Sequence, residues 1–256
     1  MIKKHFNSLH RINAKAVIIA TFSAFSLLPF FGLSLHGSER LSESFTSPIG
    51  NVPPDWKMVA KGREVIAEIQ EISDTNQTAL LIQRPGKNPA NALVYYEGPG
   101  TQQFGDFTAS VTFSYDQQPS ATSSSRGILL RAQVPQYERA EGYYIAVEPY
   151  NMERALSIFW NPISHVENEL TLATSPIQDP LNPHTKYILE VSAKGHVIEA
   201  SLWSTTPAGA KDQELASVMT DEAVHAGSGY FGLRSAHGNS GPVSSWFHAL
   251  HLQENE

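Results

Sequence analysis

The chain has 256 residues, 41% of them hydrophobic and 17% charged, which is enough to build one large hydrophobic core or two small ones. Its formal net charge is −7 and it has no basic stripe, which argues against a nucleic-acid partner, because neutralising phosphates requires clustered Lys and Arg. It contains no cysteine, so disulfides, a thiol nucleophile and a cysteine-based zinc site are excluded.

The N-terminal segment has the pattern of an export signal. Residues 1–15 carry four basic side chains and no acid, and residues 16–35 form a stretch without any charge. This predicts a signal peptide or an uncleaved signal-anchor over 1–35, and the small residues at Gly32 and Ser34 favour cleavage. The basic flank would stay cytoplasmic, so we expect an exported protein, periplasmic or extracellular. An uncleaved segment would tether it to the membrane through residues 16–35.

The rest of the chain has the pattern of an all-β domain. Residues 36–55 are polar and rich in turn formers, and we expect a lead-in there. From Trp56 onward, short β-type segments alternate with Gly, Pro, Asn and Asp turns about every 8–12 residues. The predicted strands are 56–60, 63–69, 78–83, 91–96, 105–115, 126–133, 142–148, 154–160, 168–173, 186–193, 196–203, 214–219, 229–235 and 245–252. Apolar and polar residues alternate in several of them, as in 107–115, which predicts a two-sheet antiparallel jelly-roll sandwich over 56–252, preceded by an N-terminal hydrophobic signal helix.

The order of these segments resembles a known fold family. In sequence, they read "DWKMVAKGREVIAE", "FGDFTASVTFSY", "RGILLRAQ", "EGYYIAVEP", "TKYILEVSAKGHVIEASLW", "GYFGLRS" and "SSWFHALHL". This order resembles the concanavalin A-like lectin/glucanase jelly roll, and more narrowly the laminin-G-like and 3-keto-disaccharide hydrolase-type domains of exported bacterial proteins. The resemblance covers about Phe45 to Leu252 and implies carbohydrate as the ligand class.

Two departures from that family bear on catalysis and metal binding. The Glu-x-Asp-x-x-Glu strand of its glycosidase branch is absent. The closing strand reads Phe247–His248–Ala249, where the family usually has Phe-Asp-Asp. The resemblance allows calcium but leaves it without assigned ligands, and we predict no metal site and no other cofactor.

Alternation along three strands predicts the candidate ligand site. If the aliphatic residues of these strands fill the core, the opposite face carries Arg131, Tyr144, Glu148, Tyr230 and Arg234. Saccharide sites combine aromatic rings that stack on the sugar with charged groups that hydrogen-bond its hydroxyls. Trp203 falls on the polar phase of its strand and is predicted at the rim. The alternative interpretation is an Arg–Glu network that satisfies only its own charges.

The sequence therefore favours an exported, non-catalytic module that binds carbohydrate or a cell-surface polymer. A second hypothesis is a glycoside or 3-keto-glycoside hydrolase with Glu148 as acid or base, because glycoside hydrolysis requires carboxylates. A third is an envelope interaction module held at the membrane by residues 16–35.

Overall fold

The computed structural model describes residues 39–46, 48–61, 65–73, 75–84, 90–100, 104–116, 124–133, 135–136, 139–148, 154–161, 170–223, 227–237 and 243–255. The predicted signal segment over 1–35 lies outside these residues and stays a prediction.

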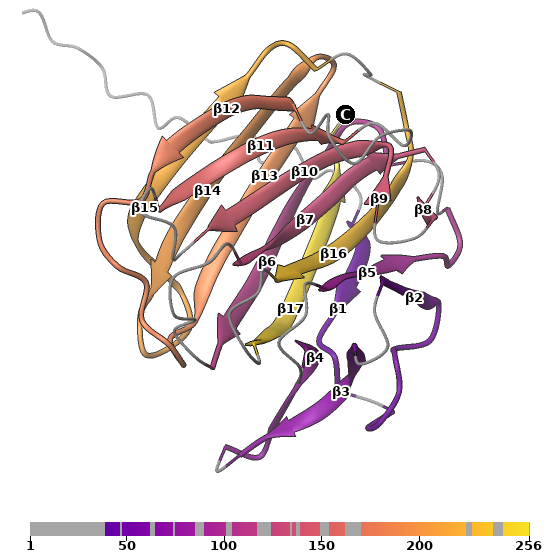
Figure 1. Cartoon of the computed structure of the whole chain (residues 1–256), viewed down its shortest axis with the longest axis vertical. Coiled ribbons are helices and arrows are strands. Elements are labelled where there is room, and N and C mark those ends of the chain that lie inside the picture. Colours follow the sequence, from indigo (N-terminus) through magenta and orange to yellow (C-terminus); the bar gives the residue numbers. More distant parts are fainter. Residues whose placement is uncertain are drawn as a thin grey trace, which may run out of the picture. The chain divides into compact units, whose positions relative to one another are not determined.

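The described chain folds into two antiparallel sheets that pack face to face (Figure 1). The strands are β1 (Glu39–Glu43), β2 (Trp56–Lys61), β3 (Ile66–Ile72), β4 (Gln77–Arg84), β5 (Ala90–Tyr96), β6 (Phe107–Tyr115), β7 (Ser124–Ala132), β8 (Pro135–Gln136), β9 (Arg139–Ala140), β10 (Gly142–Glu148), β11 (Ala155–Asn161), β12 (Leu170–Pro176), β13 (Tyr187–Lys194), β14 (Val197–Thr205), β15 (Lys211–Thr220), β16 (Tyr230–His237) and β17 (Val243–Glu254). The predicted all-β, two-sheet jelly-roll sandwich is confirmed.

Strand order in each sheet shows that neighbours in space are often distant in sequence. The eight-stranded sheet runs β15-β14-β13-β6-β17-β4-β3, with β1 pairing β17. The seven-stranded sheet runs β12-β11-β10-β7-β16-β5-β2. Strands β8 and β9 form a separate small hairpin. The central strands of the seven-stranded sheet are thus β10, β7 and β16, which carry the predicted site residues.

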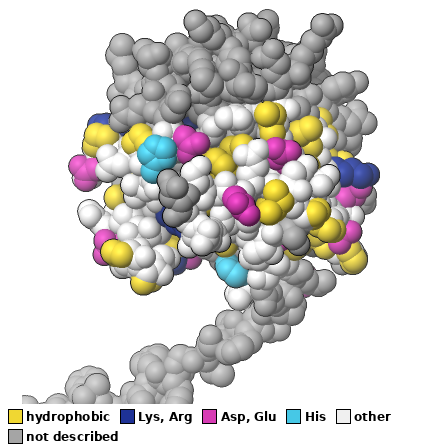
Figure 2. All heavy atoms as spheres, turned by 90° about the horizontal axis from the view of Figure 1, so that it is seen from below, with side chains coloured by type: hydrophobic (Ala, Val, Ile, Leu, Met, Phe, Trp, Pro, Cys, Tyr) yellow, Lys and Arg dark blue, Asp and Glu magenta, His cyan; other side chains and the backbone are white. Residues whose placement is uncertain are grey.

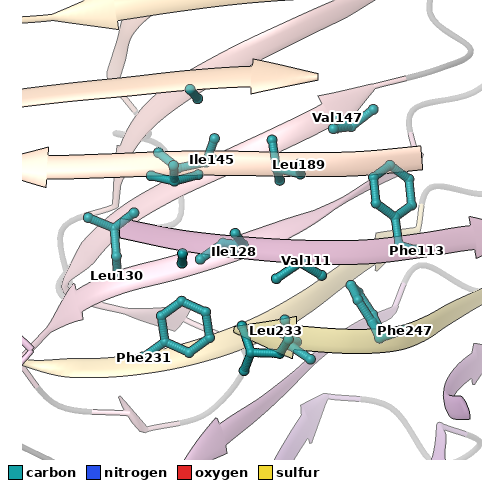
Figure 3. Packing of buried hydrophobic residues seen from close by; sticks show 14 of the residues in the cluster. Val111, Phe113, Ile128, Leu130, Ile145, Val147, Leu189, Phe231, Leu233 and Phe247 are labelled. Carbon is teal, nitrogen blue, oxygen red and sulfur yellow. The ribbon is translucent and has the colours of Figure 1, made fainter. Parts of the chain in front are cut away.

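The core lies between the two sheets and is built by alternation (Figure 3). Ile145 and Val147 of β10 share this core with Val111 and Phe113 of β6 in the other sheet, and all four are at most 1% exposed. Aliphatic and aromatic side chains at every second position of a strand point to one side, so each strand turns one apolar face toward the opposite sheet. Burial of this surface is the main stabilising contribution to the sandwich.

The segment expected as a lead-in contributes to the domain. Within 36–55, β1 pairs with β17, and Phe45 is fully buried with its ring edge-on to Trp56 at 6.0 Å between centroids. The sequence of β1 is polar and alternates little, so its own pattern does not predict the strand. Its register is set by pairing with β17.

Candidate functional site

A second, smaller apolar cluster covers the side of the seven-stranded sheet that faces away from the core, which we term the outer face. Its buried members are Leu93, Tyr95, Leu129, Ala132, Tyr144 and Ala146, with Val59, Phe159 and Tyr230 half-buried against them. Strand pairing arranges these residues in rows across the sheet. One row contains Tyr95, Gly232, Leu129, Tyr144 and Phe159, and the next contains Leu93, Arg234, Gly127, Ala146 and Ser157.

The central feature of the outer face is an Arg–Tyr stack. The guanidinium carbon of Arg234 lies 4.2 Å from the centroid of the Tyr144 ring, which is a cation–π contact. The Tyr144 hydroxyl lies 3.0 Å from the Ser125 Oγ, and its ring is stacked with Phe159 at 6.4 Å. Tyr144 is 2% exposed and Arg234 6% exposed, so both lie at the floor of the face.

A second aromatic pair lies beside this stack. The Tyr230 ring, half-buried, meets the Tyr95 ring edge-on at 5.7 Å. Burial, together with the charge of Glu97, raises the pKa of Tyr95. Lys57 of β2 forms an exposed ion pair with Glu97, and this hydrogen bond raises the pKa of Lys57.

Glu148 lies at the other end of the outer face. It is half-buried, and its Oε2 lies 3.5 Å from the Ser157 Oγ, which is itself 3.0 Å from the Thr174 Oγ1. Glu148 is the one carboxylate carried by the seven strands of this sheet. Along β10 it is four residues from Tyr144, a separation of about 13 Å in an extended strand.

The structure places Arg131 away from the outer face, contrary to the expected phasing. Its backbone has a φ of 51°, at a β-bulge where the pairing of β16 with β7 shifts register. This turns the side chain toward the eight-stranded sheet, where Arg131 is fully buried and donates to the Gly105 carbonyl at 2.9 Å, the Gly195 carbonyl at 2.6 Å and the Asp106 carboxylate at 3.0 Å. Burial lowers the pKa of Arg131, and the charge of Asp106 opposes that shift.

Trp203 also lies elsewhere than expected. It belongs to β14 in the eight-stranded sheet, on the face opposite the core, where Lys211 lies 5.2 Å from its ring centroid and pairs with Glu190. It is therefore not at the rim of the outer face of the seven-stranded sheet. Strand phase predicted its side of the strand but not the sheet to which the strand belongs.

The structure brings Tyr144, Glu148, Tyr230 and Arg234 to one face, as the alternation of β10 and β16 indicated. The prediction omitted Tyr95, Ser125 and Phe159, which complete that face. Tyr95 and Phe159 each alternate with core residues in their own strands, so the same pattern could have found them.

Among the described residues, no three His, Asp or Glu side chains gather within reach of one metal ion. Two hollows lie away from the outer face. One is lined by Phe104, Asp106, Phe107, Leu252 and Glu254 together with Pro99 and Gly100. The other lies between the edge strands β12 and β15. Within the described part of the chain, no helix is long and apolar enough to cross a bilayer.

Solved structures share this fold. Lectin II from Ulex europaeus matches with a TM-score of 0.57 at 10% identity, over 86% of this chain and 100% of that one. The exoplasmic/lumenal domain of VIP36, in a Ca2+/Man-bound form, matches with a TM-score of 0.55 at 12% identity, over 79% of this chain and 84% of that one. The carbohydrate-binding module CBM66 from Bacillus subtilis matches with a TM-score of 0.50 at 14% identity, over 81% and 100%.

No protein-family model matches the sequence, and no curated protein matches it either. The structural likenesses define the class: the chain is a β-sandwich with the concanavalin A-like jelly-roll fold. The predicted resemblance to that fold is confirmed. The narrower likeness to laminin-G-like and 3-keto-disaccharide hydrolase-type domains stays a prediction.

Proposed function

We propose that the chain is an exported, non-catalytic module that binds carbohydrate or a cell-surface polymer on the outer face of the seven-stranded sheet. The observation that carries this proposal is the Arg234–Tyr144 stack flanked by half-buried Tyr230 and Glu148 on one sheet face. Aromatic rings beside a few polar groups are the usual composition of a saccharide site. Structures with the same fold include forms bound to mannose and to galactose.

The exposure of each side chain determines the role that we assign to it in binding the sugar. Tyr230 is held edge-on by Tyr95 and is half-buried, so its ring is the stacking platform for a sugar. Glu148 accepts hydrogen bonds from sugar hydroxyls, and Arg234 donates them. Tyr144, being 2% exposed, acts from beneath as the support that orients Arg234.

The strand composition favours binding over hydrolysis. Glycoside hydrolysis uses two carboxyl groups, about 5–5.5 Å apart in retaining enzymes and about 6.5–9.5 Å apart in inverting ones. The seven strands of this sheet supply Glu148 alone. A hydrolase would therefore need its second carboxylate from outside these strands.

Calorimetric titration with a panel of oligosaccharides tests the proposal. We expect Tyr230→Ala to weaken binding about tenfold or more, because it removes the stacking ring. Trp203→Ala is the matched control, an aromatic truncation on the other sheet, and should leave affinity unchanged. Absence of binding by the native chain, or an equal loss in both variants, would contradict the proposal.

Glu148→Gln separates the binding and hydrolase hypotheses. Saccharide binding that survives Glu148→Gln, without release of reducing sugar by the native chain, supports the non-catalytic module. Release of reducing sugar that disappears in Glu148→Gln would support the hydrolase instead.

Export rests on the basic 1–15 segment and the uncharged 16–35 segment. Sequencing the N-terminus of the protein recovered outside the cytoplasm should show cleavage near Ser34. An intact N-terminus in the membrane fraction, together with no sugar binding, would support the tethered envelope module.

A further inference from the structure

Charge is distributed unequally between the two sheets. The strands of the seven-stranded sheet carry five basic residues and one acid, a net charge of +4. The strands of the eight-stranded sheet carry four basic residues and nine acids, a net charge of −5. A chain with a net charge of −7 therefore concentrates positive charge on the sheet that holds the proposed site.

Three of these cations are already accommodated within the protein. Lys57 pairs with Glu97, and Arg131 pairs with Asp106. The guanidinium carbon of Arg126 lies 4.6 Å from the centroid of the Tyr115 ring, where Arg126 is fully buried. These three cations therefore already have interaction partners within the protein.

Arg234 differs from these three. It is 6% exposed, its Nε is buried without a hydrogen-bond partner, and no carboxylate among the described residues forms an ion pair with it. Its guanidinium lies over the face of the Tyr144 ring. Burying a charged group without a counter-charge is costly, so a nearly buried, unpaired guanidinium is a site that an anionic group would satisfy.

The surroundings of Arg234 suit a planar anion attached to a sugar. Toward β10, the positions next to it in its row are Gly127 on β7 and then Ala146, neither of which carries a side chain larger than a methyl group, whereas Leu93 of β5 lies on its other side. The guanidinium is held by its stack on Tyr144 and can offer paired N–H donors to a carboxylate. On the same face, Tyr230 would stack on the sugar ring and Glu148 would accept hydrogen bonds from the sugar hydroxyls.

We propose that Arg234 is the receptor for the carboxylate of an acidic saccharide, so that the ligand class is a uronate-containing glycan rather than a neutral one. This inference rests on the proposed carbohydrate-binding function and specifies its ligand class. It follows from Arg234, a nearly buried cation of the outer face that has no ion-pair partner among the described residues.

Matched sugar pairs test the inference: glucuronate with glucose, galacturonate with galactose, and mannuronate with mannose, which differ only at C6. In titrations followed by NMR chemical shifts, we expect the acid of at least one pair to bind about tenfold more tightly than its neutral partner. Arg234→Gln should abolish that preference, because it lowers the affinity for the acid more than the affinity for its neutral partner, until the two are about equal. Lys57→Gln, which removes an exposed cation of the same sheet, is the control and should retain the preference.

The outcomes separate the two proposals. Equal binding of acid and neutral forms in every pair, or a preference that survives Arg234→Gln, overturns the carboxylate receptor and leaves carbohydrate binding intact. Binding of neither form overturns carbohydrate binding as well. Should Arg234→Gln not fold, Arg234→Lys decides. A point-charge ammonium should reduce the preference, and an unchanged preference would overturn the assignment.

Discussion

A single side chain ties the two sheets together at one end of the sandwich. Arg131 starts from β7 in one sheet, and its acceptors, Gly105, Asp106 and Gly195, all flank strands of the other. Asp106 also accepts the Gly195 amide at 2.9 Å, so the carboxylate and the guanidinium organise the same turn. The left-handed backbone of Arg131 makes this crossing possible, and no sequence pattern announces a left-handed arginine. This is why strand alternation misplaced it.

We predict that Arg131→Met lowers the free energy of unfolding by about 2–3 kcal/mol, because two half-buried carbonyls and one carboxylate lose the charged donor that joins them. Urea denaturation measures it. Lys211→Met is the control, since the Lys211–Glu190 pair is partly exposed and should contribute less than about 1 kcal/mol. Equal losses in the two variants would mean that Arg131 does not join the sheets.

His248 gives the fold a pH dependence of its own. Burial, with a smaller contribution from the charge of Lys186, lowers the pKa of His248 to about 3, and its Nε2 lies 2.8 Å from the Ser114 Oγ. The unfolded chain, with an ordinary histidine pKa near 6.5, therefore binds the proton more readily than the folded one. The stability due to neutral His248 is complete above about pH 6.5 and is lost as the pH falls toward 3.

We predict that the unfolding free energy of the native chain falls relative to that of His248→Gln by about 1 kcal/mol per pH unit between pH 6 and 4. Urea denaturation of both proteins across that range measures the difference. The comparison cancels the carboxylates that the two chains share. Parallel pH profiles would show that His248 titrates normally.

At the level of elements, strand phase was predictable where a strand alternates strictly and its partners stay in register. Strand β10 stays in register with both neighbours, and β16 does so from Gly232 to His237, so the faces of Tyr144, Glu148 and Arg234 followed from the sequence. Strand β7 also places core residues at every second position, Ile128 and Leu130, but its bulge opposite β16 is a property of the pairing and not of its own residues. Sheet membership, which displaced Trp203, is likewise set by long-range pairing.

The contact between β7 and β10 depends on Gly127. A Cβ added there would collide with the Ile145 carbonyl oxygen and approach the Ala146 Cα within 3.3 Å, both backbone atoms of β10. We predict that Gly127→Ala costs about 2–3 kcal/mol or more, because a backbone neighbour cannot rotate away. Thermal and urea unfolding measure this. Gly227→Ala, where the added Cβ meets open space, is the control and should stay within about 0.5 kcal/mol. Similar losses at both positions would contradict the close approach.

For the whole molecule, the unequal distribution of charge between the two sheets affects how tightly this acidic chain binds an anionic polymer. On the face shown in Figure 2, acidic and basic side chains are dispersed among polar ones without a broad basic patch among the described residues. The net charge of −7 alone would repel a polyuronate, whereas Arg234, the outer-face cation without an ion-pair partner among the described residues, would attract its carboxylates locally. Added salt weakens both interactions, but weaker attraction lowers the affinity for the polymer, whereas weaker repulsion raises it.

We predict that polygalacturonate binds less tightly as sodium chloride rises from 20 to 300 mM. The Debye length at about 0.1 M salt is about 10 Å, so added salt screens the attraction between the sheet and the polymer along with the longer-range repulsion of the whole chain. The repelling acids lie mostly on the other sheet, so their repulsion at the site is already weak at low salt, and the loss of attraction dominates. Its fully methyl-esterified form is uncharged and should show no such trend in the same titrations. Binding of the acid form that strengthens with salt would show that the charge of the whole molecule, and not that of one sheet, governs the encounter.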